Sequence, residues 1–181
     1  ENVGTQTAPS FKLVNLDFAR VSELSRKALH PAFGDMDADA DQDMIIGDFD
    51  GFLHYYRNDA APGAPASFSL IYIQMFFIDV GQFSAPFIYD IIGDSLPDLI
   101  VGEKSGNGTA QRRGEVNYFE NIGTATNFIF DTLPTNDVFG EIDVRISGFP
   151  NGYCKPVNST LDSSGDLYIL SGSEEGTIKV F

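Results

Sequence analysis

One segment of this 181-residue chain recurs three times at a fixed length. In each copy a proline precedes a glycine by 16 residues, and the pairs are Pro31 and Gly47, Pro86 and Gly102, and Pro156 and Gly172. Each segment runs from a short apolar stretch through a polar loop into a second apolar stretch, which is the pattern of two strands joined by a loop. A fixed period is the signature of a repeat architecture, so the fold must be built from similar units.

A further apolar arm follows each of the three glycines. The arms read "GFLHYYRN", "GEVNYFEN" and "GTIKVF", and they begin at Gly51, Gly114 and Gly176. Their alternation, rich in aromatic and β-branched side chains, predicts strands that form hairpins with the preceding stretches. The segment after this arm leads to a phenylalanine and another apolar run, and these phenylalanines are Phe11, Phe68 and Phe130. The pattern therefore predicts about four strands per unit.

The two ends of the sequence fit the same period. The last residues, "GTIKVF", joined to the first, "ENVGT", match the internal stretch "GEVNYFENIGT". We therefore expect a single repeat domain, residues 1–181, with units at about 1–57, 58–119 and 120–181. Helical patterns are nearly absent, and we expect residues 18–29, "FARVSELSRKAL", to be a loop or a single turn.

Four-stranded units of this length, rich in glycine and aromatic residues, predict an all-β fold made of β-propeller blades. A β-sandwich is the alternative that the pattern leaves open. A propeller closes with roughly four to eight blades, so three units leave two flanks uncovered. We expect either that the chain is part of a larger propeller or that two copies form one ring.

The charge of the chain excludes several classes of partner. It has 11 basic and 26 acidic side chains and a formal net charge of −15, which repels nucleic acid and anionic lipid surfaces. The sequence has no apolar run long enough to cross a membrane and no signal-peptide pattern, so we expect no direct membrane insertion. Cys154 is the only cysteine, so no internal disulfide is expected.

Aspartate occupies every second position of the first polar loop, at Asp35, Asp37, Asp39, Asp41 and Asp43. The first three match positions 1, 3 and 5 of a calcium loop, while Asp41 would bind through its carbonyl and Asp43 through its side chain. Hard oxygen ligands in this number suit Ca²⁺ better than Mg²⁺ or Zn²⁺. The alternative, a solvated acidic turn, leaves the regular spacing unexplained.

The other two loops hold fewer carboxylates. The second offers Asp90, Asp94 and Asp98 but has Ile92 and Leu96 between them, so we expect a weak metal site or none. The third loop has no carboxylate at its first or last position and is expected to be empty; its residues are Thr160, Asp162, Ser164, Asp166 and Tyr168.

The segment "FGDMDADADQDMIIGDFDGFLHYYRN" resembles the VCBS and FG-GAP class of propeller repeats, in which a D-x-D-x-D-x-x-D calcium loop precedes a strand, a glycine and an aromatic arm. The segments "SAPFIYDIIGDSLPDLIVGEKSG" and "VNYFENIGT" fit the same pattern. Proteins of this family are secreted or lie on cell surfaces, many of them bacterial, as adhesive or scaffold modules. The resemblance implies an extracellular location, where millimolar calcium fills even a modest site.

Catalytic patterns are scarce. His30, His54 and Cys154 lack neighbouring partners in the sequence and are expected to pack or to lie on the surface, so we expect no enzyme activity. The second unit has a longer hairpin tip with Asn107, Arg112 and Arg113, which is a candidate partner-binding loop because rigid scaffolds often bind through such tips. A merely solvated hairpin is the alternative.

These observations predict a calcium-stabilised, extracellular propeller module that acts as a structural or adhesive scaffold within a larger surface protein or assembly. Its partner would be a protein or the remaining blades of a parent propeller. A carbohydrate-binding propeller, with a glycan as the partner, is the second hypothesis. An accessory domain of a secreted enzyme is the third.

Overall fold

The computed structural model describes residues 1–61, 63–106, 114–145, 152–159, 161, 163, 166–173 and 176–181. Within these ranges ten strands form three antiparallel sheets. Helix is limited to three short 3-10 segments, η1 (Phe18–Leu24), η2 (Met75–Phe77) and η3 (Phe139–Glu141). The expectation of an all-β protein is confirmed.

The first sheet contains four strands in sequence order: β1 (His30–Gly34), β2 (Asp43–Gly47), β3 (Leu53–Asn58) and β4 (Phe68–Tyr72). All five residues of β2 are buried, because this strand is central and both of its faces are covered. The loop that joins β1 to β2 is the aspartate-rich stretch, so two paired strands hold both of its ends.

The second and third sheets each have three strands. These are β5 (Ala85–Tyr89), β6 (Asp98–Gly102) and β7 (Val116–Phe119), followed by β8 (Lys155–Ser159), β9 (Tyr168–Gly172) and β10 (Ile178–Val180). The first two strands of every sheet pair in the same register, as in His30 with Gly47, Ala85 with Gly102, and Lys155 with Gly172. Equivalent positions in the three sheets can therefore be compared directly.

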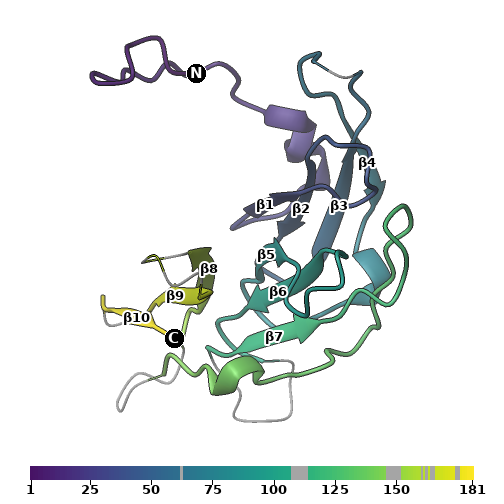
Figure 1. The fold of residues 1–181 in the computed structure, drawn as a ribbon, viewed down its shortest axis with the longest axis vertical. Helices are drawn as coiled ribbons and strands as arrows, with labels where there is room; N and C mark the ends of the chain where they lie inside the picture. Colours follow the sequence, from purple (N-terminus) through teal and green to yellow (C-terminus); the bar gives the residue numbers. More distant parts are fainter. Residues whose placement is uncertain are drawn as a thin grey trace.

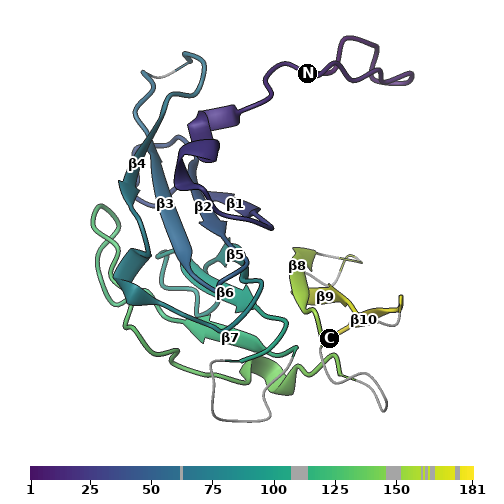
Figure 2. The ribbon, with the colours of Figure 1, turned by 180° about the vertical axis from the view of Figure 1, so that it is seen from behind.

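The three sheets follow one another along an arc (Figure 1, and from behind in Figure 2). Their first strands β1, β5 and β8 lie next to one another on the concave side of the arc, while β4 lies on its convex side. Among the residues that the structure describes, only the first sheet has the expected fourth strand. Beside β7, a single bridge between Tyr118 and Asn136 takes its place among the described residues, and nearby Pro134 cannot donate a ladder hydrogen bond.

The apolar core lies between the sheets. Residues of β2 and β3 such as Ile45 and Leu53 pack against Leu99 and Val101 of β6. The opposite face of β6 carries Ile100, which belongs to a second cluster shared with the third sheet. Alternate residues of one strand thus face the two neighbouring sheets, as strand geometry requires.

The stretch 18–29 contains η1 and packs over the outer face of the first sheet, where Val21, Leu24 and Leu29 contact the buried cluster that includes Met44. The segment is interrupted, because Ala19 and Arg20 have positive φ angles of 54° and 53°. This agrees with the expected loop or single turn.

Candidate metal centre

Asp43 anchors the aspartate loop to the sheet. Its side chain is 1% exposed, and both carboxylate oxygens accept hydrogen bonds. Oδ2 accepts from the backbone N–H of Met36 at 3.1 Å and from the Tyr55 hydroxyl at 2.8 Å, and Oδ1 accepts from the N–H of Asn58 at 2.8 Å. Burial raises the pKa of Asp43, and these hydrogen bonds oppose that shift. The anchor thereby fixes the loop against β3.

The carboxylates of Asp35, Asp37 and Asp39 are brought together above this anchor. One oxygen from each lies within 4.8 Å of the others. Two oxygens of the group have local donors, because Asp35 Oδ2 accepts from the N–H of Ala40 at 3.1 Å and Asp39 Oδ1 accepts from the N–H of Asp41 at 3.0 Å. The predicted convergence of the first three aspartates is therefore observed.

Three buried carboxylate oxygens of the loop have no hydrogen-bond partner among the described residues. They are Oδ1 of Asp35, Oδ1 of Asp37 and Oδ1 of Asp41. Buried polar atoms are almost always paired, because leaving one unpaired costs about 1–3 kcal/mol and more for a charged group. Such oxygens need a donor or a cation, so the residues fit a bound hard metal ion.

The electrostatics of the loop lead to the same conclusion. Burial raises the pKa of Asp37, and the negative charges of Asp43, Asp39 and Asp35 raise it further. Burial likewise raises the pKa of Asp41, with the charge of Asp39 adding to it. The carboxylates repel one another in the metal-free loop, and a divalent cation would remove that repulsion.

The second loop repeats the two backbone hydrogen bonds of the first and adds two more, both to Oδ1 of Asp90. Asp90 accepts from the backbone N–H groups of Gly93 at 2.7 Å, Asp94 at 3.2 Å and Ser95 at 2.8 Å. Asp94 accepts from the N–H of Leu96 at 2.9 Å. The loop therefore satisfies these two side chains with its own backbone, and no oxygen of either is among the buried unpaired atoms of the described chain.

Asp98 repeats the anchor of the first loop. It is 1% exposed and accepts from the N–H of Ile91 at 3.0 Å, the Tyr118 hydroxyl at 3.2 Å and the N–H of Asn121 at 2.9 Å. Sequence reasoning treated Asp43 and Asp98 as metal ligands and missed this shared role. The signal was present in the tyrosine four residues and the asparagine seven residues after Gly51 and Gly114.

Several other predicted positions lie outside the described residues. These are Asn107, Arg112 and Arg113 of the candidate partner-binding loop, and Thr160, Asp162 and Ser164 of the third polar loop. Of that loop's remaining residues, Asp166 is exposed and Tyr168 pairs with Ser159 at the start of β9.

The histidines and the cysteine are engaged in packing. His54 is fully buried, and its Nε2 lies 3.1 Å from Asp48 Oδ2, while burial lowers the pKa of its ring. His30 Nδ1 lies 3.0 Å from the carbonyl oxygen of Ser84. Burial raises the pKa of the Cys154 thiol to about 12, which keeps it protonated and unreactive at neutral pH.

No helix in the described part of the chain has the length and apolar character that a membrane crossing needs. Comparisons with family models, with curated proteins and with solved structures found no match for this chain.

Proposed function

We propose that the chain is an extracellular, calcium-stabilised β-propeller module that serves as a structural or adhesive interaction scaffold without catalytic activity. The observation that carries the proposal is the set of three buried, unpaired carboxylate oxygens in the loop from Asp35 to Asp43. A calcium ion would be held by the side chains of Asp35, Asp37 and Asp39, with Asp41 supplying a further oxygen.

Calcium would act here as a clip rather than as a catalyst. The loop joins β1 to β2, and Asp43 ties it to Tyr55 and Asn58 on β3. A cation bound between the carboxylates would therefore hold three neighbouring strands of one sheet in register. Because β1 also lies against β5 of the next sheet, the stabilisation would extend to the contact between sheets.

Two features support the propeller part of the proposal. The first two strands of all three sheets pair in the same register, and an apolar cluster is buried between each two neighbouring sheets. Radially repeated antiparallel sheets use this kind of packing. The packed histidines and cysteine are compatible with a scaffold, whose surfaces rather than its buried side chains engage partners.

The proposal is tested by thermal melting in millimolar calcium against excess chelator. For the wild type, a site filled at about 100 times its dissociation constant adds roughly 2.7 kcal/mol to the free energy of unfolding, which is about 5–10 °C for a chain of this size. The double variant Asp37→Ala with Asp39→Ala should lose this calcium-dependent shift.

Asp94→Ala is the matched control, because Asp94 stands in the second loop where Asp39 stands in the first. It should keep the full calcium-dependent shift of the wild type. A wild type that melts at the same temperature in calcium and in chelator contradicts the proposal, and so does a shift that survives in the double variant.

A further inference from the structure

Two glycines allow neighbouring sheets to approach closely at the ends of their second strands. A Cβ atom on Gly47 of β2 would lie 2.2 Å from the carbonyl oxygen of Ser84, just before β5. A Cβ on Gly102 of β6 would lie 2.4 Å from the carbonyl oxygen of Cys154, just before β8. Only glycine fits at these two positions, because the next sheet occupies the space of the side chain.

The glycines that open the following strands behave in the same way. A Cβ on Gly51 would lie 1.9 Å from the carbonyl oxygen of Gly81, and one on Gly114 would lie 2.2 Å from Cα of Gly152. Each of the first two sheets therefore presents a pair of glycines to the sheet that follows it.

The third sheet carries the same pair without a neighbour. A Cβ on Gly172 or on Gly176 would meet no described atom within 4 Å. The positive φ of 83° at Gly176 explains that glycine by its turn alone. Gly172 has no positive φ and no close neighbour, so nothing in the described chain requires glycine there.

The apolar side chains around Gly172 are also uncovered. Val157, Ile178 and Val180 are 55%, 73% and 51% exposed. In the second sheet the equivalent positions are Phe87, Val116 and Tyr118, which are buried against the third sheet. The outer face of the third sheet thus has the composition of an internal contact, and no sheet of the described chain covers it.

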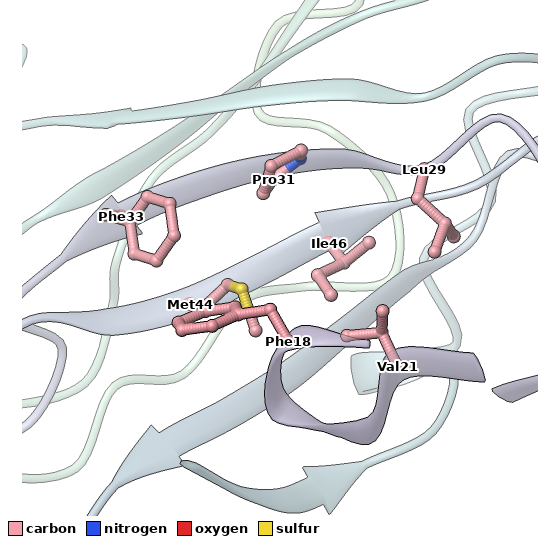
Figure 3. Close-up of a pocket in the computed structure, with 7 residues that line it drawn as sticks. All are labelled: Phe18, Val21, Leu29, Pro31, Phe33, Met44 and Ile46. Atoms are coloured by element: carbon pink, nitrogen blue, oxygen red, sulfur yellow. The ribbon is translucent and has the colours of Figure 1, made fainter. Parts of the chain in front are cut away.

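The opposite end of the arc offers the outer face of the first sheet together with the segment 18–29, which packs over it and leaves Met44 and Ile46 only 1% and 2% exposed. These two residues correspond to Leu99 and Val101, the residues with which the second sheet packs against the first. Beside them lies an apolar cavity of about 180 Å³ (Figure 3). Its walls come from η1, from β1 and β2 and from the segment between, and they are Phe18, Val21, Leu29, Pro31, Phe33, Met44 and Ile46.

A separate observation concerns the open edge of β10, which has no fourth strand beside it in the described chain. Residues 11–16 form no part of a sheet, and Phe11, Leu13 and Leu16 are 80%, 71% and 91% exposed. Asn2 pairs with Phe11 as Asn58 pairs with Phe68, the first residue of β4. By this equivalence, residues 11–16 correspond in sequence to β4, the fourth strand of the first sheet, although they pair with no sheet in the described chain.

The turn before this segment repeats the same hydrogen bonds. Asn2 Oδ1 accepts from the N–H groups of Gly4 and Ser10, both at 3.0 Å. The side chains of Asn58 and Asn121 accept equivalent hydrogen bonds. Asn58 Oδ1 accepts from the N–H groups of Ala60 and Ser67, and Asn121 Oδ1 accepts from those of Gly123 and Ile129. Residues 1–16 are therefore prepared to continue a sheet of this kind.

We infer that a second copy of this chain covers the third sheet, head to tail. The outer face of one copy's third sheet would contact the segment 18–29 and the apolar cavity that it forms with β1 and β2 of the other copy, and residues 11–16 of that second copy would lie along β10. The uncovered face and the open edge of β10 indicate the same neighbour. In the chain, β4 pairs with the first sheet and directly precedes the second; residues 11–16 directly precede the first sheet and would pair in the same way with the sheet before it. Each copy supplies one face of each kind, so a ring of two copies would contain two such contacts.

This inference rests on the proposed propeller architecture, and its test is the mass in solution by light scattering with size exclusion. In calcium the wild type should have twice the mass of the 19.8 kDa chain. Gly172→Val should halve that mass while the circular dichroism of the chain is unchanged, because the new side chain has open space in the single copy. Thr126→Val, at an exposed turn that belongs to no sheet, should leave the mass doubled.

A second variant guards against misfolding of the first. Ile178→Asp alters a side chain that is 73% exposed in the single chain, so folding does not depend on it, and it should also halve the mass. A wild type of single mass at about 100 μM, a concentration at which micromolar affinity is saturated, overturns the inference. So does a doubled mass that survives both variants.

The melting experiment separates this outcome from the proposed calcium site. A single mass with an intact calcium-dependent shift overturns only the pairing of copies. A doubled mass without that shift overturns only the calcium clip.

Discussion

The loops 35–43 and 90–98 follow the same course between paired strands but satisfy their carboxylates in different ways. Both are closed by an aspartate that accepts two backbone N–H groups and a tyrosine hydroxyl. Both also have positive φ at equivalent positions, at Ala38 and Ala40 in the first and at Gly93 and Ser95 in the second. Only the first has buried carboxylate oxygens without partners in the described chain.

The difference comes from a few side chains. Ile92 and Leu96 stand in the second loop where Asp37 and Asp41 stand in the first. The bond from the N–H of Ser95 to Asp90 Oδ2 has its equivalent in the first loop, from Ala40 to Asp35 Oδ2, whereas the two bonds to Asp90 Oδ1 occur only in the second loop. One hairpin geometry can thus be stabilised by its own backbone or, as we propose for the first loop, by a cation.

The largest effect should come from the element that the loops share. Asp43→Ala and Asp98→Ala each remove a buried acceptor from three donors, and each should lower the free energy of unfolding by about 3 kcal/mol. Chemical denaturation in chelator measures both. Asp94→Ala, which removes one exposed hydrogen bond, is the control and should cost less than about 1 kcal/mol. Equal losses for all three variants would contradict the anchor role.

Exchange of the differing side chains should transfer the calcium response. Asp37→Ile with Asp41→Leu should abolish the shift of roughly 2.7 kcal/mol expected for the saturated first site. Ile92→Asp with Leu96→Asp should create a second site of similar kind, because the backbone of the second loop already has the required course. Calorimetric titration counts the calcium ions bound.

The expected stoichiometries are one for the wild type, none for the first exchange and two for the second. A second-loop variant that still binds a single ion would indicate that the backbone donors on Asp90 hold that loop too firmly to admit a metal.

A smaller effect distinguishes the two loops at a position where both have a positive φ. Ala38 has φ of 59° where the second loop has Gly93 at 76°. The left-handed conformation costs an L-residue roughly 1–2 kcal/mol, so Ala38→Gly should stabilise the first loop by about 1 kcal/mol and Gly93→Ala should destabilise the second by a similar amount. A Cβ on Gly93 would meet no described atom within 4 Å, so the change isolates the backbone conformation. Denaturant midpoints that do not move in opposite directions would contradict this explanation.

The spacing of the sequence was sufficient to predict the all-β fold and the convergence of Asp35, Asp37 and Asp39. Both follow from local rules, because strand alternation and a loop closed by paired strands need only neighbouring residues. The role of Asp43 could not be predicted in this way. Its donors Tyr55 and Asn58 come from β3, and only the pairing of β2 with β3 brings them to it.

The number of strands in each sheet also could not be predicted from the local sequence pattern. The first sheet has the expected four strands, whereas the second has a bridge at Asn136 in place of a fourth strand. An edge strand forms only where the neighbouring strand has free backbone groups to pair with it. A single residue such as Pro134 can prevent pairing, because proline has no backbone N–H to donate. The first sheet therefore extends beyond the predicted repeat unit 1–57, because β4, which lies in the predicted unit 58–119, pairs with β3.

The smallest expected effect is a pH dependence at Asp37 of the first loop. Burial, together with the charges of Asp43, Asp39 and Asp35, makes the pKa of Asp37 higher in the folded protein than in the unfolded chain. The folded protein therefore binds more protons at this site, so without calcium its contribution to stability falls as pH rises through that pKa. Lowering the pH from about 7 toward about 4, the usual range of carboxyl titration, should stabilise the wild type relative to Asp37→Asn in chelator. Melting both proteins across that range measures the difference, which is small because solvent screens a partly exposed carboxylate.

In calcium the sign of this pH dependence should reverse, since protons then compete with the metal for the same oxygens. A difference between the two proteins that is the same in calcium and in chelator would show that the cation and the proton do not share this carboxylate.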